Sequence, residues 1–181
     1  MPTMKRADFR FFHRLRVRWA EVDMQKIVFN AHYLMYFDTA ITEYWRALAL
    51  PMEEVFARLG GELYVKKATV EFNASAQMDD LIDVALRCER IGNSSLTLQW
   101  AAWCQGRLIV TGEVVYVHTS LATGRSSPGP DSLRAQLDAW EQALCFVSIG
   151  TVQSRKAARA RPVADSYVST LDPQKGVVPG F

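Results

Sequence analysis

The residue of this chain best placed to do chemistry is Asp23, which lies between a segment that alternates like a β-strand and a segment with the periodicity of a long apolar helix. A carboxylate beside the free amides of a helix N-terminus can attack a carbonyl carbon or activate a water molecule. The amides meanwhile stabilise negative charge on the carbonyl oxygen. This pairing suits acyl transfer, although Asp23 could also serve only to cap the entry to the helix.

A β-strand is expected before Asp23, because apolar and basic residues alternate from Phe9 to Trp19. One face of this strand carries Phe9, Phe11, His13, Leu15, Val17 and Trp19, and the other carries Arg10, Arg14, Arg16 and Arg18. The alternation indicates a half-buried strand. We expect His13, and His118 on a later strand, to be ordinary core or rim histidines.

A long helix is expected after Asp23, because apolar residues recur at helical spacing as far as Leu50. The apolar stripe consists of Leu34, Phe37, Ile41, Tyr44 or Trp45, and Leu48. Asp38, Glu43 and Arg46 are its few charges. The helix should therefore be buried on more than one face, with other elements wrapped around it.

The segments after the helix predict an antiparallel sheet. Pro51 is expected to start a short helix over residues 52–59, which Gly60 and Gly61 would end. Strand-like segments follow at residues 62–74, 81–91, 96–105 and 108–118, and the short turns between the later ones imply antiparallel neighbours. The chain is therefore expected to be an α+β protein in which an antiparallel sheet wraps around one long central helix.

A last helix is predicted over residues 131–144, because Leu133, Leu137, Trp140 and Leu144 share one helical stripe. Residues 146–181 mix small, basic, Pro and Gly residues without a clear period. We therefore expect one domain over residues 1–145, followed by a C-terminal extension over residues 146–181 without a recognisable fold.

Composition narrows the class of protein. The chain has 181 residues, 49% of them hydrophobic and 22% charged, which suits a single folded domain. A net charge of +2 with dispersed basic residues gives no reason to expect nucleic acid as a partner. Three widely spaced cysteines fit a reducing cytoplasm and show no metal-ligand spacing. We expect no signal peptide, because basic residues interrupt the N-terminus, and no membrane span.

The motifs resemble the hotdog-fold acyl-CoA thioesterases of the 4-hydroxybenzoyl-CoA thioesterase type over residues 9–142. The resemblance rests on Asp23, on the segment from Lys26 to Tyr33, on residues 36–40 and on residues 90–96. It implies a hotdog fold and hydrolysis of an acyl thioester. Lys26 stands where the family usually has Gly and Asp38 where Glu is common. Because Lys allows neither a close backbone approach nor a positive φ as freely as Gly, either the loop is reshaped or Lys26 reaches the substrate.

The resemblance also implies catalytic roles. Asp23 would be the nucleophile or the general base. The Asn30 amide would stabilise the oxyanion, or the Asn30 side chain would only cap the helix. His32 would protonate the leaving thiolate or would be a packed histidine. Asp38 would orient the other groups or take part in catalysis itself.

Substrate contacts are expected from two parts of the chain. The loop and helix start would contribute Lys26, Ile27, Val28, Phe29 and Tyr33. The end of coenzyme A that carries the phosphates would contact Arg90, Ser94, Ser95 and Arg125, or the basic run at residues 155–161. Ser94 and Ser95 could equally be ordinary turn serines, and the basic run an ordinary solvated one. Trp19, Phe29, Trp45, Trp100 and Trp103 are candidates for a bulky acyl pocket or for the core.

Three functions are therefore considered: a thioesterase acting on acyl-CoA or an acyl carrier protein thioester, a hotdog hydratase or dehydratase, and a noncatalytic acyl-thioester-binding module. No metal or other cofactor is expected, because the coenzyme A thioester is itself the substrate. Lys26 favours the noncatalytic module, and the spacing of Asp23 and His32 does not match the hydratase pattern. A homodimer or homotetramer is expected, because the open edge of such a sheet needs a partner.

Overall fold

The computed structural model describes residues 4–50 and 60–147. The predicted short helix at residues 52–59 lies outside them, as do the basic run at 155–161 and nearly all of the C-terminal extension. The described elements are the strands β1 (Phe11–Arg16), β2 (Gly61–Phe72), β3 (Leu81–Ile91), β4 (Ser95–Cys104) and β5 (Arg107–Ser120), and the helices α1 (His32–Ala47) and α3 (Asp131–Val147). The predicted strands, the central helix and the last helix are thereby confirmed.

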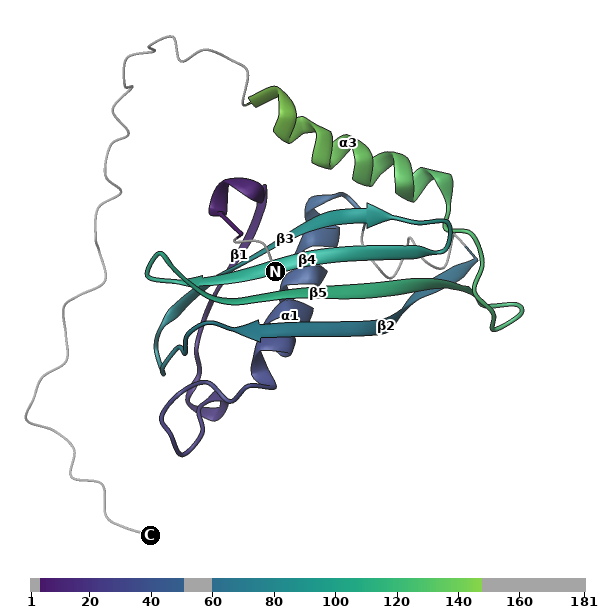
Figure 1. The fold of residues 1–181 in the computed structure, drawn as a ribbon. Coiled ribbons are helices and arrows are strands. Elements are labelled where there is room, and N and C mark those ends of the chain that lie inside the picture. Colours follow the sequence, from purple (N-terminus) through teal and green to yellow (C-terminus); the bar gives the residue numbers. More distant parts are fainter. Residues whose placement is uncertain (1–3, 51–59, 148–181) are drawn as a thin grey trace, which may run out of the picture. The chain divides into compact units, whose positions relative to one another are not determined.

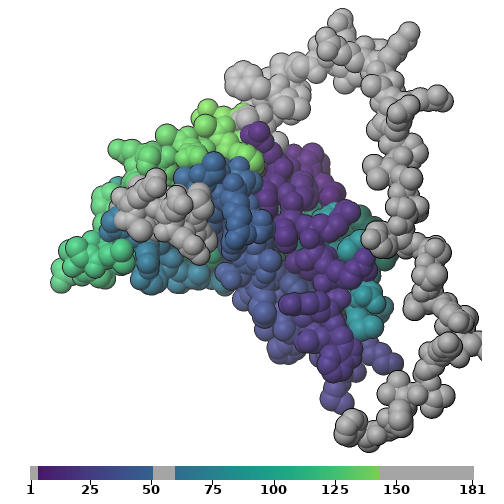
Figure 2. All heavy atoms as spheres, turned by 180° about the vertical axis from the view of Figure 1, so that it is seen from behind, coloured from purple at the N-terminus to yellow at the C-terminus, as the bar shows by residue number. Residues whose placement is uncertain are grey.

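The five strands form one sheet in the order β1-β3-β4-β5-β2, and every neighbouring pair is antiparallel. α1 crosses one face of this sheet (Figure 1). Seen from behind, α1 lies beside the purple N-terminal segment, with which it packs through β1 (Figure 2). The predicted α+β arrangement, a sheet against one long central helix, is confirmed.

The core lies between α1 and the sheet. Its helical side consists of Tyr33, Tyr36, Phe37, Ala40, Ile41, Tyr44 and Trp45. Phe37 meets Trp100 of β4 with ring centroids 5.5 Å apart, and Tyr44 meets Phe11 of β1 at 5.4 Å. Burying each such side chain contributes roughly 1.5–3 kcal/mol. Leu34, which we expected on the buried stripe, is 39% exposed, because Tyr33 takes the inward position in this first turn.

β1 is shorter than its alternation predicts, and both ends of the prediction are wrong. Phe9 precedes the strand and packs on the outer face of the sheet against Trp103, with ring centroids 5.5 Å apart. Trp19 lies in the short 3-10 helix η2 (Trp19–Glu21) and is 79% exposed. Another 3-10 turn, η1 (Arg6–Asp8), precedes β1. The apolar face of β1 therefore does not extend as far as Trp19.

α3 covers the end of the sheet where β3 turns into β4. Glu141 accepts hydrogen bonds from the Tyr44 hydroxyl at 2.9 Å and from the Cys88 amide at 2.8 Å. The Arg134 guanidinium donates to the carbonyl oxygens of Ile91 at 3.2 Å and Gly92 at 2.8 Å. None of the helices described is long and apolar enough to cross a membrane.

Candidate functional site

Asp23 begins a closed turn between η2 and α1. The Asp23 amide donates to the Ile27 carbonyl at 2.9 Å, and the Lys26 amide donates to the Asp23 carbonyl at 2.9 Å. The Gln25 amide donates to Oδ1 of the Asp23 carboxylate at 2.7 Å. Among the described residues none donates to Oδ2, so this oxygen is open to a water molecule or a substrate. The turn therefore orients the carboxylate through one of its two oxygens.

Lys26 adopts the left-handed backbone conformation, with φ of 62°. A residue with a Cβ atom takes this angle only at a cost, whereas Gly takes it freely. The positive angle gives a physical reason for a Gly at this position, and Lys26 adopts it nevertheless. The loop therefore keeps a positive φ at Lys26 and is not reshaped to avoid it.

The start of α1 leaves backbone amides free beside this turn. The Phe29 amide donates to the Glu21 carbonyl at 2.9 Å, and the His32 amide donates to the Phe29 carbonyl at 2.9 Å. In the described part of the chain, the Asn30 and Ala31 amides have no hydrogen-bond acceptor. The helix has no side-chain cap, so the Asn30 side chain does not serve as one. Two amides are thus available to an anionic oxygen.

The turn and the helix start line an open hollow together with the end of β2 and the residues that follow it. Its lining consists of Asp23, Gln25, Ile27, Val28, Phe29, Asn30, Tyr33, Phe72, Asn73, Ala74 and Ser75. The last four come from a distant part of the sequence, which is held close because the Val28 amide donates to the Ala76 carbonyl at 2.9 Å and the Ala76 amide donates to the Tyr33 hydroxyl at 3.1 Å. One hollow therefore combines the Asp23 carboxylate, the free amide of Asn30 and several apolar side chains.

A second, open hollow adjoins the first at Asp23. It is lined by Trp19, Ala20, Val22, Asp23, Met24, Lys26, Gln77 and Met78. Asp23 thus lies on the border between two concave surfaces, with Lys26 on the more apolar side. The five aromatic residues considered for an acyl pocket do not form one. Trp45 and Trp100 belong to the core and Trp103 to the outer face of the sheet, while Trp19 and Phe29 are exposed.

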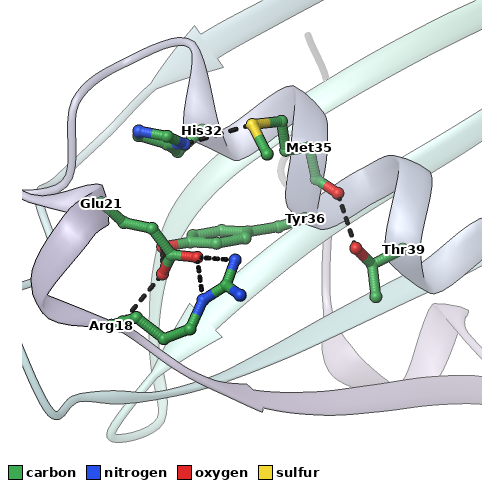
Figure 3. A network of polar contacts seen from close by, with 6 residues as sticks. All are labelled: Arg18, Glu21, His32, Met35, Tyr36 and Thr39. Atoms are coloured by element: carbon green, nitrogen blue, oxygen red, sulfur yellow. Dashed lines mark hydrogen bonds and ion pairs between the residues drawn. The ribbon is translucent and has the colours of Figure 1, made fainter.

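A buried acid beside the site, Glu21, was not among the residues singled out from the sequence. Its side chain is 3% exposed. The Tyr36 hydroxyl donates to Oε2 at 2.7 Å, the Arg18 amide donates to Oε2 at 2.8 Å, and the Arg18 Nε donates to Oε1 at 2.6 Å (Figure 3). The sequence offered one indication of this role for Glu21. It is an acid three residues after Arg18, the spacing at which a side chain can accept a hydrogen bond from the backbone amide of a capping residue.

Burial and hydrogen bonding act on Glu21 in opposite directions. Burial is the largest single effect and raises the pKa of Glu21, because it disfavours the charged form. The hydrogen bonds from the Arg18 amide, the Tyr36 hydroxyl and the Arg18 guanidinium together outweigh it, so the pKa lies below its ordinary value. Burial and the neighbouring Glu21 carboxylate raise the pKa of Tyr36. Glu21 is therefore a carboxylate and Tyr36 a hydroxyl donor at neutral pH.

Neither His32 and Asp38 on α1 nor His118 on β5 forms a hydrogen bond or ion pair with Asp23. The His32 ring lies against Met35, with Nδ1 3.2 Å from the sulfur (Figure 3). It also lies edge-on to Phe29, with ring centroids 6.1 Å apart. Asp38 is exposed and lines neither hollow. His118 is buried and its Nδ1 lies 3.0 Å from the Ser127 hydroxyl. The contacts of His32 pair it with apolar neighbours rather than with an acid.

The residues expected at the phosphates of coenzyme A lie elsewhere. Ser94 lies in the β3–β4 turn and Ser95 begins β4, at the far end of β3 from Ala76. The length of β3, roughly 33 Å at 3.3 Å per residue, therefore separates them from the Asp23 site. Both line a small enclosed pocket beneath α3. Arg90 is exposed at the end of β3, and Arg125 is exposed in the segment between β5 and α3. Within one chain, these residues are not brought together with Asp23.

Comparisons with known proteins agree with this fold. Residues 17–137 match the family model described as the thioesterase-like superfamily. The chain is 25% identical over 92 residues to the acyl-CoA thioesterase YbgC of Haemophilus influenzae, which covers 51% of this chain and 68% of that protein.

Solved structures share the hotdog fold. A thioesterase from Thermus thermophilus, complexed with coenzyme A and Zn, is 26% identical, with a TM-score of 0.64, and the match covers 74% of this chain and 96% of that one. A hypothetical protein from Aquifex aeolicus, 23% identical, has a TM-score of 0.65 over 71% of this chain and 99% of that one.

Proposed function

Because the chain belongs to the thioesterase-like superfamily, we propose that it hydrolyses an acyl-CoA, or an acyl carrier protein thioester, to a free acid and a thiol. The observation that carries the proposal is that Asp23 lines one hollow together with residues at the start of α1. A carboxylate supplies the nucleophile or base that hydrolysis requires, and free helix amides supply charge stabilisation. The likeness to a thioesterase complexed with coenzyme A supports coenzyme A as the thiol.

In the proposed reaction the thioester carbonyl oxygen binds at the Asn30 and Ala31 amides. As a base, Asp23 takes a proton from water, whose oxygen bonds to the carbonyl carbon. The carbon–sulfur bond then breaks and the thiolate leaves, to be protonated. As a nucleophile, Asp23 bonds to the carbonyl carbon itself, and the carbon–sulfur bond breaks so that the thiolate leaves. Water then cleaves the resulting anhydride to the free acid and the Asp23 carboxylate. A single turnover in heavy-oxygen water separates the routes, because the anhydride route can place the label in the Asp23 carboxylate.

The alternative functions gain no support from the contacts. A hydratase would pair an acid with a nearby histidine, but His32 packs against Met35 and Phe29. A noncatalytic module was suggested by Lys26 in place of Gly, yet Lys26 adopts the positive φ that a Gly would. Hydrolysis is therefore the function that the site supports best.

The test is hydrolysis of a panel of aliphatic and aromatic acyl-CoAs and an acyl carrier protein thioester. Asp23→Asn should lower kcat by about 10²–10⁴-fold, the range for loss of a general base. Asp138→Asn makes the same chemical change on the exposed surface of α3 and should leave the rate unchanged. Equal rates for Asp23→Asn and wild type would exclude Asp23 from the reaction. No turnover of any thioester would favour a binding module.

We also propose that two chains pair along β2. Within the described structure β2 is the last strand of the sheet and pairs only with β5. Its Tyr64, Val65 and Phe72 side chains are more than half exposed. A partner strand would cover this open edge, and because Phe72 also lines the hollow, it would complete the wall of the site. Light scattering should give at least twice the mass of one chain, and a monomer would refute the pairing.

A further inference from the structure

We infer that Glu21 is a positioning residue, which holds the Asp23 turn and the start of α1 at the spacing that thioester hydrolysis requires. The inference rests on the proposed function, since it concerns the same site. Glu21 lines neither hollow, so it acts through its neighbours and not by touching the substrate.

The main chain of Glu21 ties the two halves of the site together. Its carbonyl oxygen accepts the Phe29 amide at 2.9 Å. Phe29 immediately precedes Asn30, whose amide is one of the two free donors, and Glu21 lies two residues before Asp23. This hydrogen bond therefore joins the segment that carries the catalytic carboxylate to the residue just before the proposed oxyanion site.

The side chain of Glu21 adds a second tie, which orients the helix. Tyr36, one turn into α1, reaches the Glu21 carboxylate at 2.7 Å, while Arg18 holds the same carboxylate from η2 through its amide and its guanidinium (Figure 3). The free amides of Asn30 and Ala31 directly precede the first turn of the helix that Tyr36 anchors. A small rotation of α1 would move those amides relative to Asp23.

Only a carboxylate satisfies this set of partners. Both oxygens of Glu21 accept hydrogen bonds, from the Tyr36 hydroxyl and the Arg18 amide on one side and from the Arg18 guanidinium on the other. A glutamine would place an NH₂ group against donors on whichever side it occupied. Leaving such buried groups unpaired is costly, and the helix would shift to relieve the conflict.

The expected effect follows from the sensitivity of catalysis to position. A displacement of about 1 Å can lower the rate by about 10²-fold, whereas substrate binding depends on a wider surface. Glu21→Gln should therefore lower kcat by about 10- to 100-fold with little change in KM. Tyr36→Phe, which removes the tie to the helix and leaves the carboxylate with Arg18, should lower kcat by a smaller factor. Glu21→Asp, which keeps the charge, should recover part of the lost rate.

The experiment measures kcat and KM for wild type, Glu21→Gln, Glu21→Asp, Tyr36→Phe and the double variant, each well below its melting temperature. Glu43→Gln is the matched control, because Glu43 pairs with Arg46 three residues away on the exposed side of the same helix. Its kcat should equal that of wild type. In the double variant Glu21→Gln/Tyr36→Phe the two losses in kcat should not multiply, because both substitutions remove the same Tyr36–Glu21 hydrogen bond.

Amide hydrogen exchange separates failure of this inference from failure of the proposed function. In Glu21→Gln the Phe29 amide and the first turn of α1 should exchange faster than in wild type, while β4 stays protected. If the wild type hydrolyses thioesters but Glu21→Gln keeps wild-type kcat per folded molecule, Glu21 is only structural and the inference is overturned. If no thioester is hydrolysed but exchange rises as expected, the proposed function fails and the coupling of Glu21 to α1 stands. Unchanged exchange would overturn the coupling.

Discussion

The substitution Lys26→Gly tests whether the site loop carries a conformational cost. Lys26 has φ of 62° at the tip of the turn that begins at Asp23, and its own amide donates to the Asp23 carbonyl at 2.9 Å. The hydrogen bond therefore holds Lys26 in a conformation that its Cβ atom opposes. Glycine would make the same bond without the steric penalty.

The magnitude is the difference between two effects. A side chain in the left-handed region costs roughly 1–2 kcal/mol. Glycine gives back about 0.5–1 kcal/mol, because the unfolded chain is then more flexible. Lys26→Gly should therefore raise the free energy of unfolding by about 0.5–1 kcal/mol. For a chain of this size 1 kcal/mol shifts Tm by about 2–4 °C, so Tm should rise by about 1–4 °C.

Differential scanning calorimetry measures the shift, with two controls. Lys26→Ala removes the same charge but keeps the Cβ atom, so it should give no gain. Ala49→Gly changes a second residue with positive φ, 55° at the end of α1 and far from the loop, and should raise Tm by a similar amount. If alanine stabilised the protein as much as glycine at position 26, the charge and not the backbone angle would be the cause, and the reasoning would be refuted. The same two variants test whether Lys26 contacts the substrate. If it does, KM should rise equally in Lys26→Gly and Lys26→Ala, because both lose the lysine side chain.

Two further predictions concern the sheet. Gly112→Ala should lower the free energy of unfolding by about 1–3 kcal/mol, because the new Cβ would lie 2.2 Å from Nε1 of the fully buried Trp100. A denaturant titration measures this loss. Gly129→Ala is the control, because the atom nearest to its new Cβ would be 3.9 Å away. The hydrogen bond from Arg14 holds the pKa of Asp83 below its ordinary value, so its stabilising effect is present at neutral pH and is lost as the pH falls through that lowered pKa. Asp83→Asn should therefore lower Tm at pH 7 but not near pH 2, and an equal loss at both would contradict the ion pair as the cause.

Periodicity predicted the strands and helices well and their ends less well, for a local reason. The alternation of β1 continues to Phe9 and Trp19, but acid side chains close 3-10 turns on either side of the strand. The Lys5 amide donates to Asp8 at 2.7 Å, and the Arg18 amide donates to Glu21 at 2.8 Å. A basic residue followed by an acid three positions later was visible in the sequence at both places. Turn chemistry of this kind overrides a strand pattern because the side chain satisfies a backbone amide that the sheet would otherwise use.

The site was predictable only where it is continuous in sequence. The turn and the helix start follow one another from Asp23 to Tyr33, so their proximity follows from connectivity. The opposite wall, residues 72–75, depends on the hydrogen bonds of Ala76 with Val28 and Tyr33, which no local pattern shows. The serines of the β3–β4 turn were expected beside the same ligand, but the length of β3 separates them from Asp23 within one chain.

Glu21 and Asp23 show why residue type alone could not assign the roles. They are acids two positions apart in the same short loop. A carboxylate that performs a reaction must leave an oxygen facing the substrate, and Asp23 has one oxygen tied to Gln25 and the other without a donor among the described residues. A carboxylate that fixes geometry must use both oxygens, as Glu21 does with Arg18 and Tyr36. Burial and the number of carboxylate oxygens that accept hydrogen bonds therefore distinguish the roles of the two acids. Both of these properties arise only in the folded chain.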